Sequence, residues 1–279
     1  MPWAPELFSA PALQQVRDKY RREHLLAVPF FDGLMAGEVD ALVESFAGVP
    51  ELQHPVRGRI RGERAVRHYV EDTAAWLAAR ACEVEMVNVV ATDGRGAEEV
   101  VLHLDDGHGG RVGLPVALTS DRKPGRIVEL RLYFSSWPLV GHHSNRPPVL
   151  QPEAGLEAPD VAGAYLRALA DGDVEAAVAA FEPDACMCEP AGEPYVHRGT
   201  RELRALYERF FSNGGGIPLE LCTVTDDGRA CAVEYNVVTW GRTALSPAAG
   251  MAIYTRGESG RLAAARMYDD ADPPLPARF

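Results

Sequence analysis

The chain repeats itself at a constant offset of 135 residues. Glycine, apolar and proline positions near the start of one copy recur in the other, and so do an arginine and a tyrosine near its end. The matching pairs are Gly37 with Gly172, Val39 with Val174, Val43 with Val178, Phe46 with Phe181, Pro55 with Pro190, Gly125 with Gly260, Arg126 with Arg261, Arg131 with Arg266 and Tyr133 with Tyr268. Because the offset has the length of a whole domain, the repeat predicts a tandem duplication.

Each copy begins with helical periodicity and ends with alternating strands. In the first copy the pattern predicts helices up to about residue 80, interrupted by a brief strand at 52–55 and with the basic run 57–67 as a turn and helix start. Four strands are predicted to follow, at 82–90, 98–104, 111–119 and 126–134. The second copy predicts helices at 161–170, 174–181 and 200–211, and strands at 186–189, 219–225, 230–240, 249–255 and 261–268. The fold class is therefore α+β. We expect two tandem cone-shaped barrels, each with three helices packed in a curved, mostly antiparallel sheet that closes around an apolar cavity.

Proline and loss of periodicity mark the boundary between the copies. Residues 146–159 include the run Arg146-Pro147-Pro148 and lack any helical or strand pattern. We therefore predict a first domain at 1–145, with a helical N-terminal extension at 11–28, a proline-rich linker at 146–159 and a second domain at 160–279.

Composition excludes several classes of partner. With 28 Lys+Arg against 40 Asp+Glu, the formal charge of -12 repels nucleic acid and anionic membranes. No stretch of eighteen apolar residues and no basic-then-apolar leader is present. Five cysteines, an odd number, favour reduced thiols and a cytoplasmic protein. Cys186 and Cys188 lack a second Cys/His pair nearby in sequence, so we expect no metal, and nothing implies another cofactor.

Each half resembles the nuclear transport factor 2-like folds, in particular the SnoaL-like polyketide cyclases and the ketosteroid isomerases. The resemblance rests on the Gly-Asp-Val-Glu-Ala run from Gly172, the Glu189-Pro190 strand end, Gly199 before a helix and the closing Gly-Arg-Leu strand from Gly260. It covers nearly all of 160–270 and, more faintly, 28–140. It implies the fold more strongly than the function, since this fold hosts enzymes, binding modules and transport adaptors.

The isomerase branch implies a tyrosine donor on the first helix and a carboxylate base at a strand end. Tyr165 and Glu189 occupy these positions. The second acid of that branch falls near Ala252, so the sequence departs from it there. Epoxide-opening relatives pair the strand-end carboxylate with an acid on the first long strand, near Glu220, and SnoaL-like cyclases use an acid near the last strand, for which Asp269 and Asp270 are candidates. Strict alternation would instead turn Glu220 outward.

Four further residues are candidates for contact with a ligand. Tyr235 alternates with Val233 and Val237 and so predicts a cavity wall. Tyr268 lies on the last strand. In the first copy His54 stands where the second has Glu189, Phe30 stands where it has Tyr165, and His103 lies on a strand. A histidine can serve as a base, although a single one is more often structural, so we expect the first pocket to be chemically different or inert.

These observations predict a small-molecule enzyme of the polyketide cyclase, isomerase or epoxide hydrolase type, with its pocket in the second domain. Glu189 would be the general base and Tyr165 the hydrogen-bond donor to a hydrophobic ligand. The alternative is a non-catalytic ligand-binding or scaffold protein of the same fold. Members of this fold often pair through their sheets, so we expect the two halves to form an intramolecular pseudo-dimer, with further homodimerisation left open.

Overall fold

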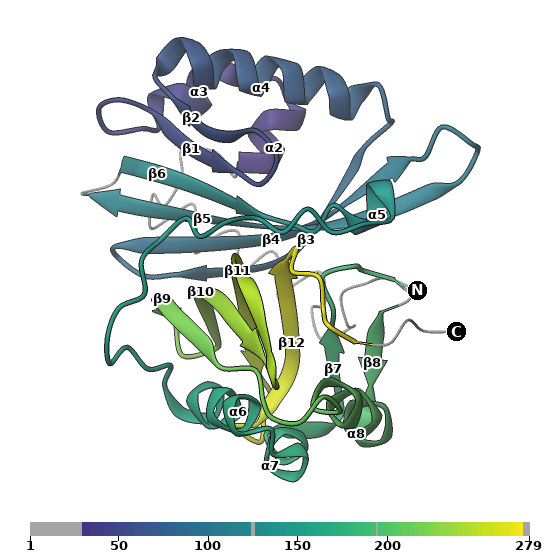
Figure 1. The fold of residues 1–279 in the computed structure, drawn as a ribbon. Helices are drawn as coiled ribbons and strands as arrows, with labels where there is room; N and C mark the ends of the chain where they lie inside the picture. The colour runs from purple at the N-terminus through teal and green to yellow at the C-terminus, as the bar shows by residue number, and fades with distance from the viewer. Residues whose placement is uncertain (1–29, 124–125, 194, 276–279) are drawn as a thin grey trace. The chain divides into compact units, whose positions relative to one another are not determined.

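The computed structural model describes residues 30–123, 126–193 and 195–275, which form two compact units that divide between Phe134 and Ser135. The helix predicted at 11–28 lies outside the described residues. Each unit combines one curved sheet with helices packed on it (Figure 1). The units are therefore described separately.

In its described residues, the first unit is a six-stranded mixed sheet with three helices. Its strand order is β2-β1-β6-β5-β4-β3, in which β1 and β6 are parallel and all other neighbours are antiparallel. The elements are α2 (Phe30–Met35), α3 (Val39–Glu44), β1 (Glu51–His54), β2 (Gly58–Arg61), α4 (Glu63–Ala78), β3 (Glu83–Ala91), β4 (Arg95–Asp105), β5 (Arg111–Lys123) and β6 (Arg126–Tyr133).

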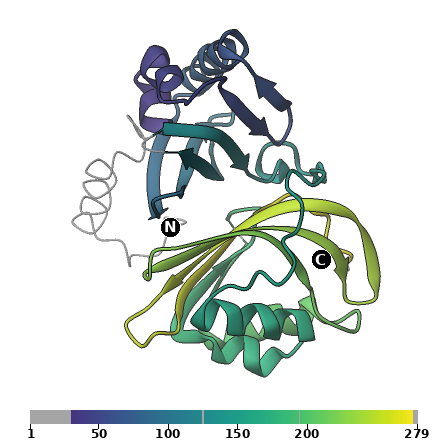
Figure 2. The ribbon, with the colours of Figure 1, turned by 90° about the vertical axis from the view of Figure 1, so that its left-hand side faces the viewer.

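The second unit repeats this plan. Its order is β8-β7-β12-β11-β10-β9, again with one parallel pair, β7 with β12. After a short α5 (Trp137–Val140) come α6 (Asp160–Asp171), α7 (Val174–Ala179), β7 (Phe181–Cys188), β8 (Val196–Arg198), α8 (Gly199–Phe210), β9 (Leu219–Asp226), β10 (Ala230–Trp240), β11 (Thr243–Arg256) and β12 (Leu262–Asp269). Figure 2 shows the long strands of this sheet curving around α6 and α8.

The identical strand order of the two sheets confirms the tandem α+β architecture. The turn glycines agree as well, since Gly37 and Gly172 end corresponding helices with φ of 70° and 71°. A positive φ is readily adopted by glycine and strained for other residues, so the repeat preserves a backbone requirement at this turn.

The core of the second unit follows from helix and strand periodicity. Leu203, Leu206, Tyr207 and Phe210 recur at three- and four-residue spacing along α8 and are buried. They pack with the inward side chains of the sheet, such as Met187, in one apolar cluster. Since successive strand residues point to opposite faces, Met187 also fixes the direction of Glu189, two residues later.

Two strands differ from the sequence prediction. The basic run 57–67 contains the edge strand β2 rather than only a turn and helix start, and β8 was not predicted. Both are short and pair with a single neighbour, β1 or β7. In β2 the exposed Arg59 and Arg61 pair with Glu51, and Ile60 alone is partly buried, which is too short a pattern to mark a half-buried strand.

The division at Phe134/Ser135 comes before the end of the first domain predicted at residue 145. Residues 135–145 contact the second unit, because Ser135, Ser136, His143 and Ser144 all bond Asp270. The predicted linker 146–159 contains neither helix nor strand. It lies along β9 and β10, where Leu150 O accepts from Asn236 Nδ2 at 3.0 Å and Leu221 O accepts from Glu153 N at 2.9 Å.

None of the helices in the described part of the chain is long and apolar enough to cross a membrane.

Candidate active site

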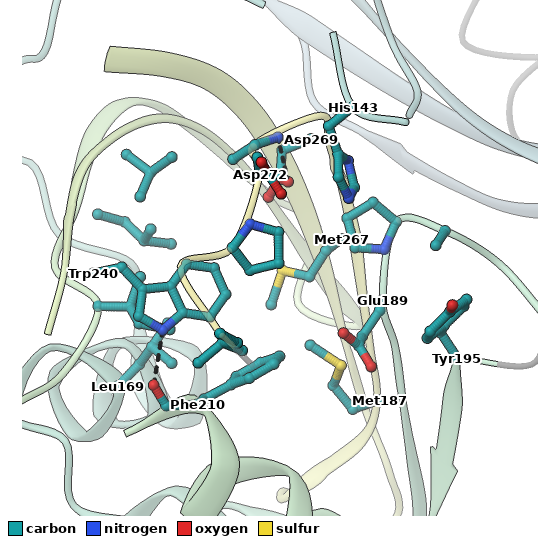
Figure 3. A pocket seen from close by; sticks show the side chains of 18 of the residues that line it. His143, Leu169, Met187, Glu189, Tyr195, Phe210, Trp240, Met267, Asp269 and Asp272 are labelled. Atoms are coloured by element: carbon teal, nitrogen blue, oxygen red, sulfur yellow. Dashed lines mark hydrogen bonds between the residues drawn. The ribbon is translucent and has the colours of Figure 1, made fainter. Parts of the chain in front are cut away.

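The second unit contains a cavity of about 410 Å³ between its helices and its sheet, partly open to solvent (Figure 3). This volume lies in the range of roughly 300–1,000 Å³ that small-molecule sites occupy. Aromatic and aliphatic side chains make most of the wall, while a few charged groups reach into it. The apolar lining includes Trp137, Leu169, Met187, Tyr195, Phe210, Ile217, Leu219, Val237, Trp240, Met267 and Leu275; the charged lining is His143, Glu189, Arg209, Asp269 and Asp272.

Glu189 enters the cavity directly after β7. It follows Met187 by two residues and therefore points to the same face, and Pro190 stops the strand because it lacks an N–H. Its Oε1 lies 2.7 Å from Nε2 of His197 on β8, and both side chains are largely buried, 12% and 15% exposed. With Glu189 ionised, the imidazole Nε2–H donates, so His197 orients the carboxylate and stabilises its charge.

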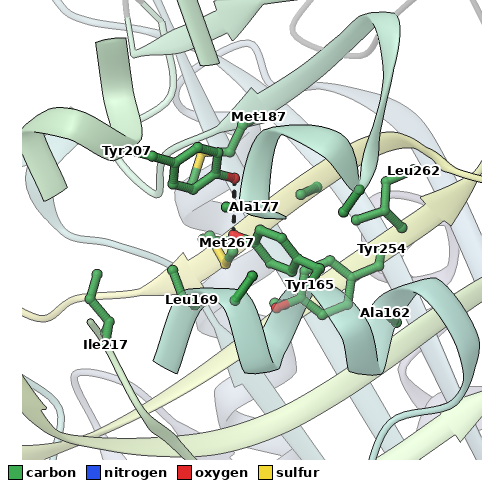
Figure 4. Close-up of a cluster of buried hydrophobic side chains, with 14 of the residues drawn as sticks. Ala162, Tyr165, Leu169, Ala177, Met187, Tyr207, Ile217, Tyr254, Leu262 and Met267 are labelled. Atoms are coloured by element: carbon green, nitrogen blue, oxygen red, sulfur yellow. Dashed lines mark hydrogen bonds between the residues drawn. The ribbon is translucent and has the colours of Figure 1, made fainter. Parts of the chain in front are cut away.

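Tyr165 is a fully buried residue of α6 that also lines the cavity. Its hydroxyl accepts a hydrogen bond of 3.1 Å from the hydroxyl of Tyr207 on α8 (Figure 4). Burial raises the pKa of Tyr165 to about 12, against the smaller opposing effect of the Tyr207 bond. Tyr165 is therefore a neutral phenol whose own proton is not used in the bond from Tyr207.

Asp269 ends β12 on the same face as Met267 and lines the cavity. The hydroxyl of Tyr235 on β10 donates to its Oδ2 at 2.7 Å. Burial raises the pKa of Asp269, and the bond from Tyr235 offsets only part of that effect. A carboxyl group with a raised pKa can hold a proton closer to neutral pH than an exposed aspartate does.

The next residue, Asp270, turns away from the cavity and joins the 135–144 segment. Its carboxylate accepts from Ser135 Oγ at 2.7 Å, Ser136 Oγ at 2.8 Å, His143 Nδ1 at 3.0 Å and Ser144 N at 2.7 Å. Burial opposes ionisation, but these donors outweigh it and lower the pKa of Asp270 to about 2. Asp270 is therefore a buried anion that fixes one edge of the cavity wall.

Residues 162–265 match the family model described as the SnoaL-like domain. The second unit contains a SnoaL-like domain. The match covers α6 to β12 and so includes Tyr165, Glu189 and Tyr235, whereas Asp269 and His143 lie beyond its ends. No curated protein sequence is significantly similar to the chain.

Several solved structures resemble one domain of the chain. A putative polyketide cyclase from Sinorhizobium meliloti is 24% identical over 39% of this chain and 94% of its own, with a TM-score of 0.34. An NTF2-like protein of unknown function from Burkholderia xenovorans is 24% identical over 42% and 84%, with a TM-score of 0.33. The epoxide hydrolase/cyclase-like enzyme of pyran ring formation in salinomycin is 21% identical over 43% and 90%, with a TM-score of 0.32.

The SnoaL-like domain brings four of the predicted site residues to one cavity: Glu189, Tyr165, Asp269 and Tyr235. Glu220 is exposed on β9, between Leu219 and Leu221, and does not line the cavity. Tyr268 is buried but precedes Asp269 by one residue on β12, so it points to the opposite face of the sheet. Neither residue can contact a ligand held in this cavity.

The two histidines predicted in the first copy belong to the first unit and have local partners. His54 Nδ1 accepts from the N–H groups of Val56 and Arg57, both at 3.1 Å, which stabilises the turn after β1. His103 Nε2 lies 2.8 Å from Oε2 of Glu85 on the neighbouring strand. Neither lines the cavity of the SnoaL-like domain.

Three polar groups of the site were not predicted from the sequence: His197, His143 and Arg209. Once β8 is recognised, the hairpin register places Met187 opposite His197, which would have brought His197 close to Glu189. In the described part of the chain, no group of three or more His, Cys, Asp or Glu side chains is arranged to hold a metal ion.

Proposed function

We propose that the SnoaL-like domain is an enzyme that transfers protons on a hydrophobic small molecule, in a reaction of the cyclase, isomerase or epoxide hydrolase type. One observation carries the proposal. One cavity, partly open to solvent, has mostly apolar walls and holds two carboxyl groups with different partners, Glu189 beside His197 and Asp269 beside Tyr235. Burial raises the pKa of Asp269. Two carboxyl groups with different surroundings in one site are suited to act as base and acid.

Glu189 is the base in this proposal. His197 holds the carboxylate in the cavity wall, and the carboxylate takes a proton from a ligand carbon or from a water that attacks an epoxide. A positioned base contributes roughly 10²- to 10⁴-fold in rate. The Glu189 side chain is only 12% exposed, so bulk water competes little for it.

Tyr165 and Asp269 are the proposed hydrogen-bond donors. Tyr207 donates to the Tyr165 oxygen, which leaves the Tyr165 proton for a ligand oxygen that gains negative charge. Asp269 with its proton retained offers a second donor. The apolar wall strengthens both interactions, because charge is poorly screened where water is excluded.

The rival function is a binding module without catalysis. The observation that favours it is Ala252, which is buried in the core of β11 where related isomerases carry their second acid. A binding module needs the cavity but not the proton chemistry of Glu189. Catalysis and binding are therefore separated by changing one carboxylate and leaving the cavity volume unaltered.

Two generic probes test the proposal. Exchange of the α-protons of 2-tetralone in D₂O reports proton abstraction next to a carbonyl, and conversion of styrene oxide to its diol reports epoxide opening. We expect activity in at least one assay, and a loss of about 10²-fold or more in Glu189→Gln with binding retained. Glu220→Gln, an exposed carboxylate outside the cavity, is the matched control.

Binding of both probes without turnover would support the rival function. Equal turnover by the wild type and Glu189→Gln, with folding intact, would remove Glu189 from the chemistry.

A further inference from the structure

The segment before the SnoaL-like domain supplies a histidine to the cavity. His143 lies between α5 and the start of the domain, and its side chain, 12% exposed, forms part of the cavity wall. The Trp137 ring packs on it with centroids 4.9 Å apart at an interplanar angle of 34°. In Figure 3 His143, Asp269 and Asp272 gather at one end of the cavity.

The bond to Asp270 fixes which nitrogen of His143 faces the ligand. A carboxylate only accepts, so Nδ1 carries a proton and donates to Asp270 Oδ1 at 3.0 Å. Asp270 itself is 3% exposed and held by three further donors, Ser135, Ser136 and Ser144. The ring therefore has a single orientation, and Nε2, for which no hydrogen bond is found among the described residues, is the nitrogen left for a ligand.

The charges around His143 favour its protonated form. Burial opposes protonation, but the bond to Asp270 and the charges of Asp270 and Asp272 raise the pKa of His143 above its ordinary value, and Asp269 adds to this effect only when it is ionised. Glu189 and Arg209 are the other charged groups of the cavity wall. An imidazolium next to a cavity is a proton donor, since it is acidic enough to release a proton near neutral pH.

We propose that His143, positioned by Asp270, is a catalytic residue that donates its Nε2 proton to the ligand oxygen that becomes negative when Glu189 removes a proton. The proposal rests on the function proposed above. It adds a proton donor from outside the SnoaL-like match at 162–265, and it requires a ligand with a carbonyl or ether oxygen at the His143 end of the cavity.

The protons balance over the step. Glu189 gains the proton that the ligand carbon or the attacking water loses, and the ligand oxygen gains the proton that leaves Nε2 of His143. His143 is then a neutral imidazole that keeps its Nδ1 proton on the bond to Asp270. Exchange with solvent returns a proton to Nε2 and removes one from Glu189.

The test compares His143→Gln, Glu189→Gln and His142→Gln in the full chain, with 2-tetralone exchange and styrene oxide hydrolysis as readouts. His142 is the neighbouring exposed histidine outside the cavity, and its variant should keep wild-type rates. We expect His143→Gln to lower kcat by about 10²-fold with little change in KM.

An unchanged rate in His143→Gln, while Glu189→Gln is impaired, overturns this proposal alone. Wild-type rates in both variants, or an inactive wild type, overturn the proposed function and this proposal with it.

A pH profile tests the role of Asp270 as a positioning residue. If His143 acts as an acid, activity falls as pH rises through its pKa. Asp270 raises that pKa, so Asp270→Asn should move the alkaline limb to lower pH. Asp272→Asn removes the charge of an exposed carboxylate and leaves the hydrogen bonds to Asp270 intact. It should shift the alkaline limb in the same direction, so the test stays valid if Asp270→Asn fails to fold. An alkaline limb at the wild-type pH in the variants that fold overturns the assignment of the acid to His143.

Discussion

Adjacent aspartates at the end of β12 show how far a residue's surroundings set its chemistry. Asp269 faces the apolar cavity with one tyrosine donor, and its pKa is raised. Asp270 faces the other way into four donors, and its pKa is lowered. Asp269 is therefore the group that can hold a proton, and Asp270 is the group that stays charged.

The depressed pKa of Asp270 predicts a pH-dependent contribution to stability. The pKa of this carboxyl group falls from 3.8 to about 2 on folding. At pH values above its unfolded pKa the group therefore contributes about 2 kcal/mol to the free energy of unfolding, and this contribution is lost as pH falls through its folded pKa. Asp270→Asn should therefore lower the free energy of unfolding by about 2 kcal/mol at pH 7, with the difference from wild type shrinking below pH 4. Urea unfolding across pH measures this, with the exposed Asp184→Asn as control. A constant difference down to pH 2 would contradict it.

The buried tyrosines give a second prediction about stability. Tyr165→Phe leaves the Tyr207 hydroxyl without its acceptor in the core, which should cost about 1–3 kcal/mol. Tyr254 is equally buried and its ring meets that of Tyr165 edge-to-face with centroids 5.3 Å apart, but its hydroxyl has no hydrogen-bond partner among the described residues. Tyr254→Phe should therefore be neutral or stabilising. Urea unfolding compares the two variants, and equal losses would contradict the assigned bond.

At the scale of elements, the repeat offers a comparison between two helix starts. Asp173 caps α7, with Oδ1 accepting from the N–H of Ala176 at 3.0 Å, whereas Glu38 at the corresponding position of α3 makes no such bond. Asp173→Ala should cost about 1 kcal/mol, and Glu38→Ala should change little. Thermal unfolding of both variants measures this, and a larger loss for Glu38→Ala would contradict the role of the cap.

The long elements were predictable from sequence because their periodicity records one buried face. Alternation along β10 placed Tyr235 inward, and along β9 it turned Glu220 outward. Glu189 was placed at the site by the family resemblance. Periodicity failed at β8, whose three residues are too few to display a period, and His197 was therefore not recognised as the partner of Glu189.

Contacts between distant segments could not be predicted from local patterns. His143 and Asp270 are separated by 127 residues, and neither lies in a motif that indicates the other. Their pairing requires the chain after β6 to run along the end of β12. The predicted domain end at residue 145 separated His143 from the unit that its side chain contacts.

At the scale of the whole molecule, the two copies share a strand order but differ in polar chemistry. His54 uses Nδ1 to hold a turn, while Glu189, at the corresponding position, faces a cavity. The two copies therefore share the packing of their helices and strands but differ in the residues that could act on a ligand.

The pseudo-dimer stays a prediction, and the oligomeric state of the second unit can test it. Strands such as Leu262-Ala263-Ala264-Ala265 are apolar at successive positions, a pattern typical of sheets covered on both faces. If the two halves pack through their sheets, residues 135–279 expressed alone should form homodimers, and the full chain should not need to. Sedimentation equilibrium measures both masses. A monomeric 135–279 would contradict the prediction.

Two truncations test which residues complete the cavity. All cavity residues found in the described part of the chain lie between Trp137 and Leu275, so a chain of residues 135–279 should bind 2-tetralone as the full chain does. A chain of residues 146–279, which keeps the complete SnoaL-like match, loses Trp137 and His143 from the wall and the donors Ser135, Ser136 and Ser144 from Asp270. Its free energy of unfolding should be lower by about 2 kcal/mol, as expected for an Asp270 without its donors. Titration calorimetry and urea unfolding measure the two effects, and because oligomerisation can also affect stability, both chains are compared at the same low concentration. Equal affinity and stability of the two truncations would show that the segment before the family match contributes nothing to the site.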